Sequence, residues 1–271
     1  MRPNPWLPLL LVATLLAAAC SKSAATIKPP KIKGSEQIAQ TYKLEDGPAT
    51  KQRVQVRDAL AMAGQRYASG DIDAAEAQAR KALKLDPTSA DAYTMLGAIE
   101  ARRGRTAVAG EHYRRAAELA PQRGEVLNNY GAWLCGNGYP VEALVWFDRA
   151  LAAPGYRSPS SALANAGGCA LKSGQNERAE RDLRRALEIQ PNNAYALASM
   201  AEYQYAQGRF FEARAFSERR LAAAPADASV LQLAARIEER LGDRAAASRY
   251  QQRLRAEFPQ AALSSTGEGP Q

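Results

Sequence analysis

The sequence predicts an all-α protein: a solenoid of six helical hairpins with about twelve helices. Six glycines recur at intervals of 34 or 36 residues, at Gly70, Gly104, Gly138, Gly174, Gly208 and Gly242. An alanine follows each glycine by five residues, at Ala75, Ala109, Ala143, Ala179, Ala213 and Ala247. A proline follows five of them by seventeen residues, at Pro87, Pro121, Pro191, Pro225 and Pro259. Glycine can end a helix in the left-handed conformation, alanine lets two helices approach closely, and proline cannot continue a helix. Each period is therefore one hairpin.

The composition excludes several classes of protein. The chain has 271 residues, of which 46% are hydrophobic and 24% charged, and it carries a net charge of +8. These values exclude a disordered or polytopic membrane protein. One histidine and three cysteines cannot supply the usual multi-ligand zinc site. We expect no metal and no cofactor other than attached lipid.

The N-terminus has the pattern of an export signal. Arg2 precedes an uncharged apolar stretch, 6–19, which ends in three alanines before Cys20. Fourteen residues of helix reach about 21 Å, short of the roughly 30 Å hydrocarbon core of a bilayer. Cleavage after Ala19 by an ordinary signal peptidase is one outcome. The other, which we favour, is a lipobox-like signal peptide at 1–19 with acyl chains, including palmitate, attached to Cys20.

The segment 20–53 has no helical periodicity and contains Lys28-Pro29-Pro30-Lys31. We expect a lipidated, flexible tether, with a partner-binding segment as the alternative. The repeats then occupy 54–261, and the small polar residues 262–271 predict a disordered tail. In bacterial lipoproteins an aspartate directly after the acylated cysteine retains the protein at the inner membrane, and Ser21 occupies that place here. The resemblance to a lipobox therefore implies a lipid anchor on the periplasmic face of the outer membrane. Export also removes nucleic acid as a natural partner of the positive charge.

The period and residue types resemble the tetratricopeptide repeat. The unit 90–123 has the spacing of that motif at Tyr93, Leu96, Gly97, Gly104, Ala109, Tyr113, Ala116 and Pro121. Units begin near Val56, Ala90, Gly124, Ser160, Ala194 and Ala228. The resemblance implies a right-handed superhelix whose stability is propagated between neighbouring repeats.

The connection between the third and fourth units is two residues longer than the others. Pro154 predicts an early end to the preceding helix, followed by a longer turn. Tyr156 in this turn either projects as a contact site or covers the end of a helix.

Cys135 and Cys169 lie on the first helices of consecutive units, which are neighbours in such a stack. In an oxidising periplasm we expect them to form a disulfide, and two separately buried thiols are the alternative.

The first helices of this family line the inner surface, where extended peptides or partner helices bind. Asparagine offers both a donor and an acceptor, so a ladder of amides can hold a peptide backbone. Bonds between adjacent helices are the alternative role for these amides. The candidate partner-binding residues, together with Tyr156, are Asn128, Asn129, Asn165, Lys172, Tyr195, Glu202 and Tyr205.

The sequence contains no constellation for catalysis. It has neither a His-Glu-x-x-His motif nor a glycine-rich phosphate loop, and we expect its one histidine, His112, to be solvated. The sequence therefore predicts a protein that is not an enzyme.

The run Val126–Cys135, the longer third-to-fourth connection and Asn165-Ala166-Gly167 resemble the PilF/PilW group of type IV pilus lipoproteins. The resemblance implies a pilotin-like scaffold that assists localisation or assembly of the outer-membrane secretin. The first alternative is a general periplasmic adaptor for peptidoglycan enzymes or outer-membrane assembly. The second alternative is an enzyme.

Overall fold

A computed structural model describes residues 47–261 of the chain. These residues form twelve principal helices and no strand. The predicted signal peptide, Cys20, most of the predicted tether and the predicted tail lie outside the described residues. The helices are α1 (Pro48–Ala68), α2 (Ile72–Leu85), α3 (Ala90–Arg102), α4 (Thr106–Leu119), α5 (Gly124–Gly136), α6 (Pro140–Ala152), α7 (Pro159–Lys172), α8 (Asn176–Ile189), α9 (Ala194–Ala206), α10 (Phe210–Ala223), α11 (Ala228–Leu241) and α12 (Arg244–Glu257).

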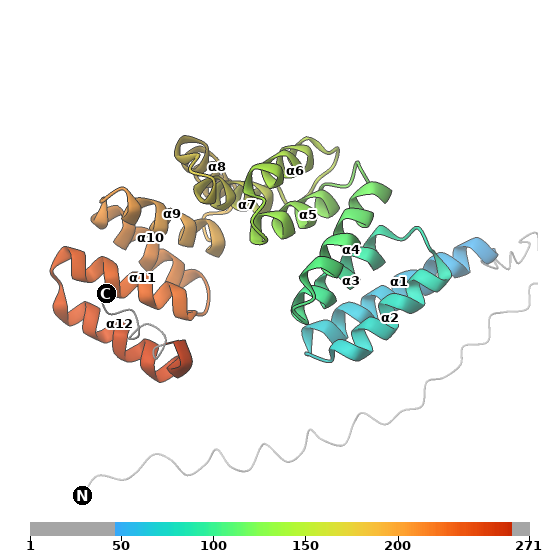
Figure 1. The fold of residues 1–271 in the computed structure, drawn as a ribbon, viewed down its shortest axis with the longest axis horizontal. Helices are drawn as coiled ribbons and strands as arrows, with labels where there is room; N and C mark the ends of the chain where they lie inside the picture. Colours follow the sequence, from blue (N-terminus) through green and yellow to red (C-terminus); the bar gives the residue numbers. More distant parts are fainter. Residues whose placement is uncertain (1–46, 262–271) are drawn as a thin grey trace, which may run out of the picture. The chain divides into compact units, whose positions relative to one another are not determined.

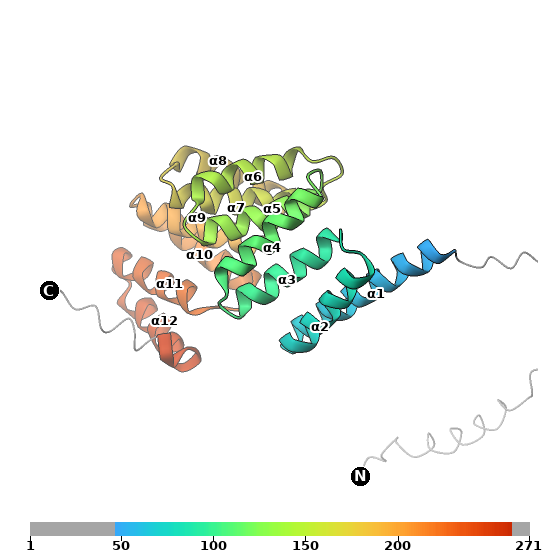
Figure 2. The same ribbon diagram turned by 45° about the vertical axis from the view of Figure 1, so that its right-hand side comes forward.

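Consecutive helices pair into six hairpins that follow one another in chain order (Figures 1 and 2). Each odd-numbered helix also contacts the next odd-numbered helix, from α1 and α3 to α9 and α11. An even-numbered helix instead contacts the odd-numbered helices on either side of it. The odd helices therefore form the closely spaced inner layer of the described part, and the even helices form the outer layer. The predicted all-α array of six repeats is confirmed.

The glycine register ends each first helix as predicted. All six register glycines have positive φ, between 73° and 89°, a conformation that a residue with a Cβ adopts only with strain. Each second helix ends two residues before a proline, as α2 ends at Leu85 before Pro87. Local backbone chemistry thus sets both the turn within each hairpin and the turn between hairpins.

Small residues let the two helices of a hairpin approach closely. Ala75 and its five register equivalents are at most 4% exposed. At Gly131 an added Cβ would lie 2.8 Å from the ring of Phe147, so only a glycine leaves room for that ring. Gly97 and Gly167 face Tyr113 and Leu183 in the same way. Large side chains on the second helix therefore fill the space that small residues leave on the first.

The first helix starts earlier than the sequence predicts. The sequence predicts a tether as far as residue 53, whereas α1 begins at Pro48. Proline suits the first turn of a helix because its missing N–H would have no helical partner there. Val56 and Leu60 pack against the buried cluster at Ala59, and the Gln52 side-chain amide donates a hydrogen bond to the Leu85 carbonyl. Packing on the first hairpin thus extends a helix that periodicity alone does not show.

The longer connection ends α6 at Ala152, as Pro154 predicts, and α7 begins at Pro159. Tyr156 does not project from this turn. Its ring packs on Gly124 at the start of α5, where an added Cβ would lie 2.5 Å from the ring. Burial raises the pKa of the Tyr156 hydroxyl to about 12. The ring covers the end of a helix, which is the second of the two predicted alternatives.

None of the helices within residues 47–261 has both the length and the hydropathy that a bilayer span requires. In the same part of the chain no three His, Cys, Asp or Glu side chains are grouped so as to hold a metal ion. His112 on α4 is half-buried rather than solvated, and burial lowers its pKa.

Candidate binding groove

Two adjoining hollows form a groove along the odd helices of the second half of the array. Lys172 and Tyr195 line both of them, so the hollows adjoin at these two side chains. The smaller one, of about 260 Å³, reaches α5 at Ala132 and Cys135. The larger one, of about 540 Å³, reaches α9 and α11. The residues of the larger hollow are Gly168, Leu171, Lys172, Ala194, Tyr195, Ala198, Ser199, Glu202, Arg220, Asp227, Ser229 and Val230.

Tyr195 lies at the centre of the groove, and a glycine places it there. A Cβ at Gly168 would lie 2.5 Å from the Tyr195 hydroxyl oxygen, so the phenol crosses α7 only because residue 168 has no side chain. The residue remains 46% exposed. Burial on the protein side raises its pKa, an effect that a hydrogen bond with Ser199 partly opposes. The groove therefore offers both an aromatic face and a hydroxyl to a bound chain.

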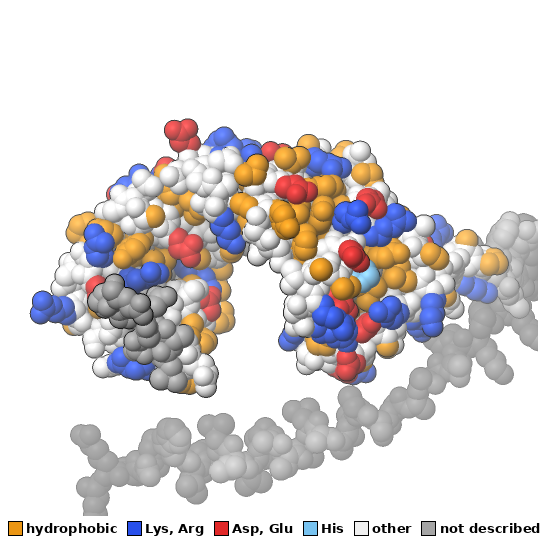
Figure 3. All heavy atoms as spheres, in the orientation of Figure 1, with side chains coloured by type: hydrophobic (Ala, Val, Ile, Leu, Met, Phe, Trp, Pro, Cys, Tyr) orange, Lys and Arg blue, Asp and Glu red, His pale blue; other side chains and the backbone are white. Residues whose placement is uncertain are grey.

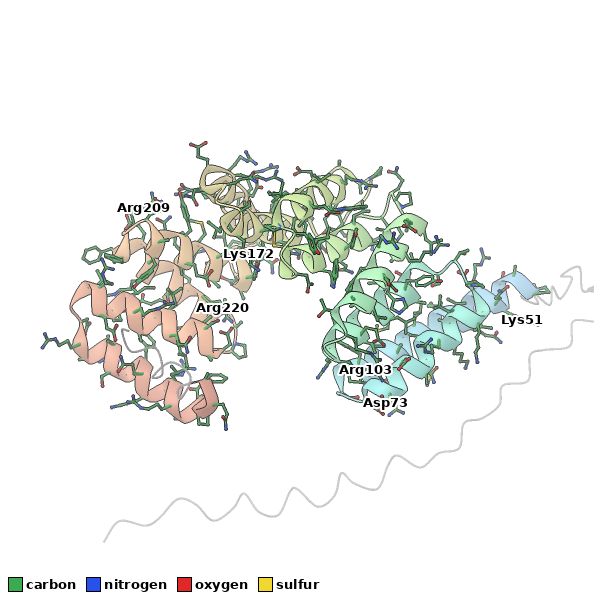
Figure 4. All side chains as sticks on the ribbon, viewed as in Figure 1. Lys51, Asp73, Arg103, Lys172, Arg209 and Arg220 are labelled. Carbon is green, nitrogen blue, oxygen red and sulfur yellow. A yellow bond between two sulfur atoms is a disulfide. The ribbon has the colours of Figure 1, made fainter. Side chains whose placement is uncertain are left out.

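Charged side chains of both signs border the groove. Reduced contact with water raises the pKa of Glu202, and the positive charges of Arg236 and Lys172 partly oppose this rise. Among the described residues, no carboxylate lies within ion-pair distance of Lys172. Arg220, whose side chain is only 10% exposed, pairs with Asp227 at 3.1 Å and also donates to the Ala224 carbonyl. Figure 4 labels Lys172 and Arg220, which both line the larger hollow.

The asparagines at equivalent repeat positions, Asn129 and Asn165, do not form a ladder of amides along the groove. The Asn165 side-chain amide donates to the Asn128 side-chain oxygen at 3.0 Å, so these two residues join α7 to α5. This is the alternative in which amides bond adjacent helices. Asn129, the register equivalent of Asn165, is half-buried on α5 and lies outside this pair.

A disulfide lies beneath the upstream end of the groove. Cys135 on α5 and Cys169 on α7 are joined, with their Cα atoms 5.8 Å apart. That separation is typical of disulfide-bonded residues. The bond fixes two inner helices against each other directly under the hollow that Cys135 lines.

Tyr205 does not belong to the groove. Its ring contacts Phe210 at a centroid distance of 5.5 Å, and the Arg236 guanidinium lies 5.6 Å from its centre. Through these contacts Tyr205 packs against the start of α10 and against α11. Four of the predicted residues thus line the groove, namely Asn165, Lys172, Tyr195 and Glu202.

Comparison with known proteins identifies the repeats and their family. Two family profiles described as Tetratricopeptide repeat match residues 60–123 and 170–237. The type IV pilus assembly protein PilF of Pseudomonas aeruginosa is 28% identical over 210 residues, covering 77% of this chain and 83% of PilF. The crystal structure of PilW, described as a widely conserved type IV pilus biogenesis factor, has 30% identity and a TM-score of 0.69, covering 80% of this chain and 98% of PilW. The chain belongs to the PilF/PilW family of tetratricopeptide-repeat proteins.

A solved structure of Pseudomonas aeruginosa PilF has the same fold, with a TM-score of 0.68 at 24% identity over 81% of this chain and all of that one. Membership of the PilF/PilW family rests on matches that extend along most of the six repeats. The resemblance stated from the sequence is therefore confirmed at the level of the family.

Sequence reasoning missed several residues that shape the groove in this PilF/PilW protein. Gly168 is one of them. It directly follows Gly167, and a second glycine within a helix is a signal that another side chain approaches the helix backbone closely. Ser199 and Ser229 are others, and a lone serine on a helix gives no such signal. What the groove can do chemically is bind: it presents an aromatic ring, hydroxyls and charges to a protein chain.

Proposed function

We propose that this protein is a non-enzymatic scaffold of type IV pilus biogenesis that holds a segment of the outer-membrane secretin in its groove and so assists secretin localisation or assembly. The observation that carries the proposal is the groove of two adjoining hollows along Lys172, Tyr195 and Glu202 on the odd helices. Membership of the PilF/PilW family supports the pilus role, because the names of both relatives state one.

The groove suits an extended segment better than a small molecule. It crosses from α5 to α11, it is open along its length, and its polar groups are spread out rather than convergent. A lipid anchor on Cys20 would hold this groove close to the outer membrane and raise the local concentration of a membrane-inserted partner. Capture by tethering thus requires no chemical step at the repeats.

Two substitutions in the groove, a charge reversal and the removal of an aromatic ring, test the proposal. We expect Lys172→Glu and Tyr195→Ala each to reduce recovery of the secretin with this protein from crosslinked cells by at least fivefold, with a matching loss of secretin multimers. Lys172 and Tyr195 are both exposed, so these changes leave the hairpins folded. Arg185→Glu, an exposed change on α8 in the outer layer, serves as the matched control.

Two results would count against the proposed function. Normal secretin multimers in a deletion strain that has an altered cell wall would favour the general adaptor instead. If radiolabelled palmitate does not label the protein, or labels a Cys20→Ser variant equally, the tethering part of the proposal is wrong.

A further inference from the structure

Ion pairs close most junctions between neighbouring hairpins on the outer side of the array. At the first junction Arg103 pairs with Asp73 and Glu76 of α2 (Figure 4). At the third, Arg178 of α8 lies 2.6 Å from Asp148 of α6. At the last two, carboxylates pair across the junction with arginines, Glu180 with Arg209 and Glu238 with Arg214.

The junction between the second and third hairpins lacks such a pair. Thirty-four residues after Asp73 and Glu76 stand Ala107 and Gly110, and Asn137 replaces the arginine. The ion pair that does join these hairpins, Arg123 with Asp91, lies at the start of α5 and α3. Among the described residues, the outer side of this junction is therefore the one without an ion pair across it.

Aromatic rings occupy the place of those charges. Trp133 lies between Tyr130 and Tyr139, with ring-centroid distances of 6.1 Å and 6.5 Å. Gly110 makes this possible, since a Cβ there would lie 2.3 Å from the indole. The rings leave an open cleft of about 560 Å³, which is lined by Thr106, Ala107, Gly110, Glu111, Arg114, Tyr130, Trp133, Asn137 and Tyr139.

Apolar side chains extend this surface onto the next helix. Tyr139, Val141 and Val145 are 54%, 64% and 57% exposed. At the register position of Val145 the two flanking units carry the charged residues Glu111 and Arg181, so this hairpin differs from its neighbours in exposing a large apolar side chain there. Hydrophobic side chains gather over α5 and α6 in Figure 3.

Two polar groups at the cleft, the Arg114 guanidinium and the Trp133 indole N–H, lack a strong ion-pair or hydrogen-bond partner among the described residues. Arg114 stands at the register position of Arg80, which pairs with Glu76 at 2.6 Å, but Gly110 replaces that glutamate. Arg114 is left with Glu118 at 3.9 Å, an exposed and weak contact. The buried Trp133 indole N–H has no hydrogen-bond partner among residues 47–261.

We infer that this outer cleft is a second binding site, for a protein segment that carries an aromatic side chain next to a carboxylate. The aromatic ring would stack on Tyr139 and Trp133, and the carboxylate would pair with Arg114 in place of the missing glutamate. Glu111 also lines the cleft, and its negative charge offsets the positive charge of Arg114. Recognition of the carboxylate therefore depends on direct pairing with Arg114 and not on a net positive charge of the cleft. The cleft lies between α4 and α5, shares no lining residue with the groove and does not depend on the proposed function.

Titration with the blocked tetrapeptide acetyl-Gly-Phe-Asp-Gly-amide tests the inference, with the full chain labelled with ¹⁵N. The readout is the indole N–H signal of Trp133, assigned with Trp6→Phe and Trp146→Phe variants. We expect a saturable shift, about threefold weaker binding when asparagine replaces the aspartate of the peptide, and loss of that difference in Arg114→Gln. Glu111→Gln should strengthen binding, because it removes a like charge near the peptide carboxylate.

Arg80→Gln is the matched control, since it changes the equivalent arginine one repeat earlier, and it should leave the titration unchanged. The inference is overturned if the tetrapeptide does not shift the Trp133 signal, or if both peptides bind equally to the unmodified chain. It is also overturned if the signal moves with protein concentration alone, because a second copy would then be the occupant.

Discussion

At the scale of single residues, Glu100 pairs with arginines within the second hairpin, and Glu76 of the first hairpin pairs with one of these arginines, Arg103. Glu100 has a side chain that is only 4% exposed, and it accepts hydrogen bonds from Arg105 and Arg103. The hydrogen bond from Arg105 holds the pKa of Glu100 below its ordinary value, and a hydrogen bond from Arg103 does the same for the pKa of Glu76. A buried charge of this kind is tolerated only while its partners remain in place.

Replacement of Glu100 should therefore be costly. We expect Glu100→Gln to lower the free energy of unfolding by about 1.5–3 kcal/mol, the range for a hydrogen bond to a charged group. Urea unfolding followed by circular dichroism measures the loss. Glu257→Gln removes an exposed pair with Arg253 and should cost no more than about 0.5 kcal/mol. Equal losses in the two variants would contradict the importance of burial.

The same carboxylates predict how stability depends on pH. Because the pKa values of Glu76 and Glu100 are lower in the folded chain than the ordinary 4.5, their stabilisation is fully present above about pH 4.5 and is lost as the pH falls through the folded values. Urea midpoints measured from pH 7 to pH 3 should fall below pH 4.5. The fall should be shallower in a Glu76→Gln/Glu100→Gln double variant, and an unchanged slope would exclude these groups as its source.

At the scale of helices, the disulfide between α5 and α7 should be the strongest single constraint. It closes a loop of 34 residues, for which the chain-entropy estimate is roughly 3–4 kcal/mol. We expect a Cys135→Ala/Cys169→Ala double variant to lose about that much stability in urea unfolding. Reducing agent should destabilise the unmodified protein by the same amount and leave the double variant unchanged. A reductant effect on the double variant would assign the loss to another cause.

Helix ends set by glycine and proline were predictable, because those residues restrict the backbone by themselves. The start of α1 was not, since 48–53 carries no apolar periodicity and becomes helical through contacts with the first hairpin. Register also placed Lys172, Tyr195 and Glu202 on inner helices. It could not show that Tyr156 folds back on Gly124 or that Tyr205 turns towards Phe210, because side-chain direction depends on neighbours that the repeat pattern does not identify.

At the scale of the whole array, the groove and the outer cleft share no lining residue, and α5 is the inner helix that lines both. The second and third hairpins contribute the cleft, and the groove runs from the third hairpin to the sixth. The disulfide joins α5, the helix that lines both regions, to α7 of the fourth hairpin. A stable centre would hold both binding surfaces in shape while the ends of the array open more easily.

Hydrogen exchange should show that gradient directly. The largest buried cluster extends from α3 to α8, whereas those at the two ends are smaller, and in a linear array each hairpin is stabilised mainly by its neighbours. We expect amides in α5 to α8 to exchange most slowly and those in α1, α2, α11 and α12 fastest among the helices. Mass spectrometry of exchanged peptides measures this order. The Cys135→Ala/Cys169→Ala variant should lose protection chiefly in α5 to α8. One exchange free energy shared by all twelve helices would instead mean that the repeats open as a single cooperative unit, and the centre would then have no special role in keeping the two surfaces in place.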